Sequence, residues 1–313
     1  MSKILTAGSI AYDHLMDFDG EFKDSILAEK DLKKLSVSFL AKTKNINFGG
    51  CSPNIAYSLS LLGDNASVIG VAGNDFKEYK EWLEDKGIQT EFVDIDKHGV
   101  TAAAYILSDK NQGQIAIFYP GAINNEEKGF GLNGFDFSGY DYAIVSPELP
   151  SRMYFWAKHF AKLKIPYIFD PGQAIPAFTK DQLMEMARDA KALIFNEYEG
   201  SLIENKIGIS LEKLAEDKEF MIKTLGAKGC QVYAGEIFDV PAVSNLNEID
   251  STGCGDGFRA GVIHGITNGF GLKRACEIGN TAASFVVEAR GTQSHYYTME
   301  LFLDRLVKNY GEK

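Results

Sequence analysis

The chain has 313 residues, of which 45% are hydrophobic and 24% are charged, a composition typical of a folded globular protein with one large domain or two small ones. Its formal net charge of −11 argues against the basic surface that nucleic-acid-binding proteins need, so we expect a small-molecule partner and no nucleic acid. Four widely spaced cysteines predict neither a zinc site nor a disulfide framework. No apolar run is long enough to span a membrane, so we expect a cytoplasmic protein without a membrane partner.

The first predicted element is a short buried strand at residues 4–7, which ends at Gly8. Asp13 follows five residues after that glycine. Because ligands of parallel sheets gather beyond the carboxyl ends of the strands, we predict that Asp13 holds substrate hydroxyls. A turn-forming or capping aspartate is the alternative interpretation.

Rough alternation of apolar and polar residues at 35–48, 101–107 and 114–118 predicts half-exposed strands. The turn-rich segment SDKNQG, residues 108–113, joins the last two. We expect these strands to form a small β lid, inserted in two pieces, that covers the site of a larger domain. The predicted boundaries are 13–48 and 99–120 for the lid, and 1–12, 49–98 and 121–313 for the large domain. Edge hairpins without a covering role are the alternative.

Between the lid pieces, the sequence NFGGCSPNIAYSLSLLG at residues 47–63 predicts a helix with a glycine pair before it. Gly49 and Gly50 allow another part of the molecule to approach the backbone closely. Asn54 then lies in the first helical turn, where an amide that both donates and accepts can read vicinal hydroxyls. A solvated asparagine at a helix start is the alternative.

Further along the chain, short apolar runs alternate with helical patterns. Strands are predicted at residues 67–71, 142–145, 167–169, 193–195 and 220–223. Helices are predicted at residues 75–86, 151–163, 181–190, 198–205, 272–289 and 299–310. Such alternation predicts an α/β fold with a doubly wound, mainly parallel sheet that is flanked by helices.

Two motifs follow strands of this predicted sheet. Asn196 and Glu199 could hold a hydrated Mg²⁺ and phosphate oxygens, although a helix capping box explains their spacing too. Thr224, Gly226 and Gly229 belong to the motif TLGAKG, whose glycines would let a flat nucleotide approach. A tight hairpin turn explains those glycines equally well.

The stretch DSTGCGDGFRAG, residues 250–261, predicts a tight loop that leads into a helix. Because glycine has no Cβ, the amides of Gly253, Cys254 and Gly255 can turn together toward an anion at the positive end of that helix. Asp256 would lie beside the anion and accept a proton from an attacking hydroxyl, as phosphoryl transfer requires. Phe258 stands where a dinucleotide-binding loop would have its third glycine. The chain also lacks the Gly-Lys pair of a P-loop. An ordinary Gly-rich loop with a first-turn helix acid is the alternative.

The loop GTQSH, residues 291–295, separates the last two predicted helices. His295 could be recruited to a site, but a lone loop histidine is more often solvated, and we expect it to be solvated here. Asn280 lies in the middle of the preceding helix.

The order of these motifs along nearly the whole chain resembles that of the ribokinase, or PfkB, family of small-molecule kinases. The shared set is an early aspartate, a glycine pair with a following asparagine, Asn-x-x-Glu, Thr-x-Gly-x-x-Gly and a late Gly-x-Gly-Asp. The resemblance implies a ribokinase-like fold with a β lid, ATP as phosphate donor and Mg²⁺ as cofactor. It also leaves open K⁺ as an activating cation and a homodimer through the lid.

The resemblance implies a role for each matching residue. Asp256 would be the catalytic base, and the anion hole would consist of the amides of Gly253, Cys254 and Gly255. The substrate hydroxyls would be bound by Asp13, Gly49, Gly50 and Asn54. ATP would be bound by Asn196, Glu199, Thr224, Gly226, Gly229 and Asn280. Asn196 and Glu199 would also hold Mg²⁺ through water, and Asp250 with the loop at 289–295 would hold a monovalent cation.

Within the family, GSIAYDHLMDFDG, NFGGCSPN, FYPGA, TGCGDGFRAG and GTQSH look most like the bacterial adenosine kinase-like branch. The predicted lid adds flat aromatic surfaces that suit a purine, namely Phe39, Phe48, Phe118 and Tyr119, although packing of the lid would explain each of them as well. We therefore expect phosphorylation of a nucleoside 5′-hydroxyl, that of adenosine first, as in purine salvage. A kinase for a free sugar such as ribose or fructose, and a nucleotide-binding protein without turnover, are the alternatives.

Overall fold

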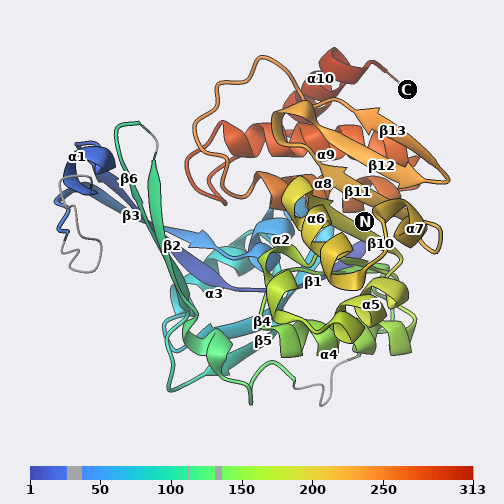
Figure 1. Cartoon of the computed structure of the whole chain (residues 1–313), viewed down its shortest axis with the longest axis horizontal. Helices are drawn as coiled ribbons and strands as arrows, with labels where there is room; N and C mark the ends of the chain where they lie inside the picture. The colour runs from blue at the N-terminus through green and yellow to red at the C-terminus, as the bar shows by residue number, and fades with distance from the viewer. Residues whose placement is uncertain (27–36, 112, 131–135, 313) are drawn as a thin grey trace.

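The computed structural model describes residues 1–26, 37–111, 113–130 and 136–312. They form a nine-stranded sheet and a four-stranded sheet. Figure 1 shows that the small sheet projects from one end of a larger body in which helices cover both faces of the large sheet. None of the helices in the described part of the chain is both long and apolar enough to cross a lipid bilayer.

The large sheet contains β1 (Lys3–Ala7), β4 (Asn65–Gly73), β5 (Gln89–Asp96), β8 (Tyr142–Val145), β9 (Tyr167–Phe169), β10 (Ala192–Asn196), β11 (Phe220–Thr224), β12 (Cys230–Ala234) and β13 (Glu236–Val240). Its strand order is β13-β12-β11-β10-β9-β8-β1-β4-β5. All neighbours are parallel except β12, which runs antiparallel to both β11 and β13. The order reverses between β1 and β8, where open α/β sheets bind their ligands. The predicted doubly wound, mainly parallel sheet is therefore confirmed.

Helices cover the two faces of this sheet in separate groups (Figure 1). One group consists of α2 (Cys51–Leu61), α3 (Lys77–Asp85), α8 (Cys254–Thr267), α9 (Leu272–Val287) and α10 (Met299–Tyr310). The other consists of α4 (Pro150–Leu163), α5 (Lys180–Asp189), α6 (Glu197–Ile207) and α7 (Leu211–Ala215). Successive strand residues alternate between them: Ile4 packs in the core with α2 and α8, while Leu5 packs in the core with α4. The central strands β1, β4, β8 and β9 bury both of their faces, as strands do in parallel sheets.

The small sheet consists of β2 (Ala11–Phe18), β3 (Ala41–Gly49), β6 (Ala102–Ser108) and β7 (Gln114–Tyr119), in the order β3-β2-β6-β7. A short helix, α1 (Phe22–Ile26), follows β2. The register pairs Asp13 with Asn47 and Ala104, and Ala104 with Phe118, so these four side chains share one face of the sheet. Residues 27–36 and 112 of the predicted lid, and residues 131–135 and 313 of the predicted large domain, lie outside the described residues. The exact domain boundaries stay a prediction.

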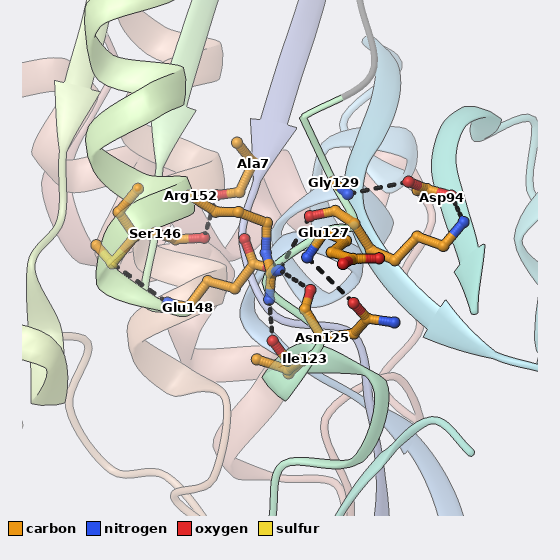
Figure 2. A network of polar contacts seen from close by, with 11 residues as sticks. Ala7, Asp94, Ile123, Asn125, Glu127, Gly129, Ser146, Glu148 and Arg152 are labelled. Carbon is orange, nitrogen blue, oxygen red and sulfur yellow. Dashed lines mark hydrogen bonds and ion pairs between the residues drawn. The ribbon is translucent and has the colours of Figure 1, made fainter. Parts of the chain in front are cut away.

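A buried arginine anchors the segment that returns from the small sheet to the large one (Figure 2). Arg152 on α4 is fully buried and donates from Nε to Glu148 at 2.9 Å. Its other nitrogens donate to the carbonyls of Asn125 at 3.0 Å and Lys128 at 3.1 Å, and to that of Ile123 in the 3₁₀ helix η2 (Gly121–Asn124). Burial raises the pKa of Glu148 to about 7, while Arg152 opposes the rise. This network fixes the base of the small sheet.

Candidate active site

The N-terminal end of α8 begins at a tight loop. Gly253 precedes the helix with a φ of 81°, a left-handed conformation that favours glycine, and a Cβ there would lie 3.0 Å from the side chain of Thr292. Asp250 holds the loop in shape, because its carboxylate accepts from the amide of Thr252 at 2.9 Å and from that of Gly291 at 3.2 Å. The backbone of this loop is therefore set by one glycine and one aspartate.

Two of the three amides predicted to face an anion are free to do so. The amide of Cys254 donates to the carbonyl of Ser251 at 3.2 Å, so its prediction is corrected: turn formation uses this donor. Across the ranges that the structure describes, the amides of Gly253 and Gly255 have no protein acceptor. Because both lie at the positive end of α8, they can receive negative charge.

Asp256 lies in the first turn of α8, and its half-buried carboxylate faces the first turn of α2. Asn54 Nδ2 donates to Asp256 Oδ2 at 2.9 Å, although the two residues are 202 positions apart in sequence. Burial raises the pKa of Asp256, while the charge of Arg259 and the hydrogen bond from Asn54 oppose the rise. A carboxylate with a raised pKa is a better proton acceptor than an ordinary one.

Asp13 on β2 is buried beside the glycine pair that precedes α2. A Cβ at Gly49 would lie 2.3 Å from Asp13 Oδ2, so this position must be glycine for the carboxylate to fit. Gly50 has a φ of 95°, and a Cβ there would meet backbone at 2.5 Å. Burial, followed by the charges of Asp256 and Asp250, raises the pKa of Asp13 to about 7. Three carboxyl groups thus gather where the two sheets meet.

A cavity of about 260 Å³ opens beside the same end of α8. Its walls include the predicted ATP contacts Thr224, Gly226, Gly229 and Asn280, together with Cys254 and Gly255. The side-chain amide of Asn280 is held in place because it donates to the carbonyl of Pro241 at 3.0 Å. The hairpin between β11 and β12 supplies Gly226 and Gly229, so one turn both connects these strands and borders the cavity.

A second cavity, of about 380 Å³, lies between the small sheet and the loop before α8. Leu15 and Asp17 line it from the face of β2 that carries Asp13, and Asp250 lines it from the loop. Asp17 also pairs with Arg290 of the large body, at 2.5 Å. The small sheet therefore covers this cavity with the face of β2 that also carries Asp13.

The model of the pfkB family carbohydrate kinases matches residues 10–299, which include all strands of the small sheet and the loop before α8. The chain belongs to the pfkB family of carbohydrate kinases. This pfkB protein is therefore a small-molecule kinase, a transferase that binds a nucleotide, and the predicted membership is confirmed.

Solved and curated relatives of this pfkB kinase include nucleoside kinases. The Burkholderia thailandensis nucleoside kinase in complex with inosine is 32% identical, with a TM-score of 0.88 and 99% of both chains covered. The same nucleoside kinase in complex with ADP-inosine gives 32% identity and a TM-score of 0.86, with 99% of this chain and 97% of that chain covered. The Methanocaldococcus jannaschii nucleoside kinase is 27% identical over 312 residues, which cover 99% of this chain and 98% of the relative. The expected ribokinase-like fold is confirmed by these structures.

Asn196 and Glu199 of this pfkB kinase form a capping box at the start of α6. Glu199 N donates to Asn196 Oδ1 and Asn196 N donates to Glu199 Oε2, each at 2.8 Å. The capping interpretation therefore describes both residues, and each keeps unused oxygen lone pairs that suit hydrated Mg²⁺. The described residues contain no group of three or more His, Cys, Asp or Glu side chains arranged to hold a metal.

The structure contains a buried ion pair, between Arg259 and Asp170, that the sequence analysis did not predict. Arg259, on α8, lies 2.5 Å from Asp170 in one contact and donates to its other oxygen at 2.7 Å. Burial raises the pKa of Asp170 to about 7, and Arg259 opposes the rise. An arginine three residues after Asp256, on a helix that otherwise buries apolar residues, was the available signal.

The aromatic residues predicted to face a purine divide into two groups. Phe118 is 56% exposed and lies on the face of the small sheet that fronts the site. Phe48 stacks on Tyr79 with ring centroids 4.3 Å apart, and Phe39 packs among aromatic rings of β2 and α1. Tyr119 lies on the opposite face from Phe118. Packing therefore accounts for Phe39 and Phe48, and Phe118 remains the candidate for a substrate base.

His295 is buried, so the expectation that it is solvated is wrong. Its carbonyl accepts from the hydroxyl of Tyr57 at 2.8 Å, and its Nε2 lies 3.3 Å from the hydroxyl oxygen of Ser58. Burial lowers the pKa of His295 to about 4. The loop at 291–295 is thus packed against α2, which the sequence of the loop alone did not indicate.

Proposed function

We propose that this pfkB kinase transfers the γ-phosphoryl group of ATP to the 5′-hydroxyl of a purine nucleoside, with adenosine as the first candidate. The observation that carries the proposal is the contact between Asn54 and Asp256, at 2.9 Å. Asn54 is suited to hydrogen bonding with ribose hydroxyls, and Asp256 is suited to accepting a proton. Their contact therefore brings these two roles together at a helix terminus with free amides. The nucleoside kinase from Burkholderia thailandensis, in its complexes with inosine and with ADP-inosine, supports the choice of nucleoside.

In this proposal, the acceptor lies under the small sheet, between the face that carries Asp13 and the first turn of α8. Asp13 accepts hydrogen bonds from the ribose hydroxyls, and Asn54 exchanges hydrogen bonds with them. Gly49 makes room for the carboxylate of Asp13 at this point. Phe118 offers its exposed ring to the base. The 5′-hydroxyl then points toward Asp256.

Phosphoryl transfer needs a proton acceptor and donors for developing charge. Asp256 takes the proton of the 5′-hydroxyl while the 5′-oxygen of the nucleoside forms a bond to the γ-phosphorus. At the same time, the bond between the γ-phosphorus and the bridging oxygen breaks, and that oxygen leaves with ADP. The amides of Gly253 and Gly255 donate to the oxygens of the moving group. ATP occupies the cavity of about 260 Å³ beside Thr224 and Asn280. The products are ADP and a nucleoside 5′-phosphate, with the released proton on Asp256.

Cations complete the proposed site. Bound Mg²⁺ would neutralise charge on the phosphates of ATP, and Glu199 and Asn196 would hold it through water. Asp250 and the loop at 289–295 would hold a monovalent cation such as K⁺. A homodimer through the small sheet and a cytoplasmic location stay predictions.

A panel of acceptors tests the proposal. The protein is incubated with ATP and MgCl₂ and with adenosine, inosine, uridine, ribose or fructose, and ADP formation is coupled to NADH oxidation. We expect purine nucleosides to exceed both sugars by more than about tenfold in kcat/KM, because a sugar leaves the contacts of the base unmade. Phosphorus NMR should then locate the product phosphate on the 5′-oxygen.

Two results would overturn the proposal. Preference for ribose or fructose would make the protein a sugar kinase. Thermal stabilisation by ATP and adenosine without any ADP formed would make it a nucleotide-binding protein without turnover.

A further inference from the structure

Gln293 is a buried polar residue in the loop that follows α9, and it is 5% exposed. Its Nε2 donates to Asn54 Oδ1 at 2.9 Å and to the hydroxyl of Tyr79 at 2.5 Å. Its Oε1 accepts from Trp82 Nε1 at 3.2 Å. Both amide hydrogens and the carbonyl oxygen are thus engaged, so the side chain has one orientation.

Trp82 determines the direction of this hydrogen-bond chain. An indole nitrogen only donates, so it can face only the oxygen of Gln293. Nε2 of Gln293 must then face Asn54, and Asn54 can only accept there with Oδ1. The Nδ2 group of Asn54 is left for Asp256 Oδ2, at 2.9 Å. Each donor points toward the carboxylate, from Trp82 on α3 to Asp256 on α8.

A second branch leads from Gln293 to the glycine pair. The hydroxyl of Tyr79 accepts from Gln293 and donates to the carbonyl of Gly49 at 2.9 Å. Gly49 is the residue that makes room for Asp13. One glutamine therefore supports both the proton acceptor and the substrate-hydroxyl contact, without touching either.

We infer that Gln293 is a positioning residue for Asp256: through Asn54 it fixes a donor on one carboxylate oxygen and leaves the other for the acceptor hydroxyl. The inference rests on the proposed function, in which Asp256 takes the proton. The hydrogen bond from Asn54 also lowers the pKa of Asp256 against the effect of burial. The other titratable or charged groups that interact with Asp256 are Asp13 from β2, Cys51 from α2, Tyr79 from α3, Asp170 after β9, and Cys254 and Arg259 from α8.

The test replaces Gln293 by methionine, which has similar length and no donor or charge. In Gln293→Met, the amide of Asn54 is free to turn, so we expect kcat to fall about 10- to 100-fold. The acidic limb of the kcat profile should move to higher pH, because Asp256 loses a donor that lowers its pKa. The KM for ATP should stay unchanged. Trp82→Phe keeps the ring and removes the donor, and should change kcat and the profile in the same direction but less.

Gln89→Met is the matched control, since it makes the same substitution at an exposed position of β5, where the amide donates only to the neighbouring carbonyl of Gly87 at 3.4 Å. We expect it to keep the wild-type kcat and profile. The inference is wrong if folded Gln293→Met, checked by its melting temperature, keeps the wild-type kcat and acidic limb, or if Gln89→Met moves both as far. If Gln293→Met does not fold, Trp82→Phe decides by the same criteria. Failure of the wild type to form ADP with any acceptor would instead reject the proposed function.

Discussion

Folding places the carboxyl group of Asp13 where its charged form is disfavoured. Its pKa rises from 3.8 to about 7, first because of burial and then because Asp256 and Asp250 lie near. Between those two pH values the folded protein therefore binds more protons than the unfolded chain. The contribution of Asp13 to the free energy of unfolding falls as pH rises through this range.

Asp13→Asn should remove this penalty. At pH 8 we expect the free energy of unfolding to increase by about 1 to 3 kcal/mol, while at pH 4 it should change little. Urea unfolding of wild type and variant at both pH values measures the difference. An equal effect of the substitution at pH 4 and pH 8 would show that Asp13 titrates normally in the folded protein. A gain in stability at a binding residue would also illustrate how sites conflict with folding.

Some residues of the site follow from sequence and others do not. Asp256 and Asn54 stand in short motifs whose glycines and helix starts are visible locally, so their types and positions predict a site. Gln293, Arg259 and Asp170 owe their places to partners far away in sequence: Gln293 is 239 positions from Asn54, and Arg259 is 89 from Asp170. No local pattern marks such pairs, so the structure was needed to find them.

At the scale of elements, continuous apolar runs were predicted most closely. The strands at residues 142–145 and 167–169 and the helix at 299–310 have the predicted bounds. β5 and β13 were not predicted, because QTEFVDID and EIFDV mix acids with apolar residues at the two edges of the sheet. Edge strands bury less of their surface, so their sequences resemble those of loops.

The anchor between α4 and η2 is an element-scale feature that can be tested. Arg152→Met would leave Glu148 buried without its partner, and would free the carbonyls that Arg152 binds. We expect the free energy of unfolding to fall by about 3 to 5 kcal/mol, as measured by urea unfolding. The double variant Arg152→Met/Glu148→Gln should recover part of that loss, because it removes the unpaired carboxyl. Equal stability of the single and double variants would contradict this account of the ion pair.

At the scale of the whole molecule, the site lies where the two sheets meet, and each contributes what the other lacks. The large sheet and α8 supply Asp256, the free amides and the nucleotide cavity. The small sheet supplies Asp13 and covers the second cavity, and its ion pair between Asp17 and Arg290 joins it to the large body. Such a cover can exclude water, so that the phosphoryl group reaches the acceptor instead of being hydrolysed.

Turnover by Asp256→Asn tests the central claim most directly. Asparagine keeps the shape of the side chain but cannot take a proton, so kcat with adenosine should fall by about 10²- to 10⁴-fold while the melting temperature stays near that of the wild type. Steady-state ADP formation measures kcat. A correctly folded Asp256→Asn protein that turns over adenosine at a near-normal rate would contradict the claim that Asp256 takes the proton in phosphoryl transfer.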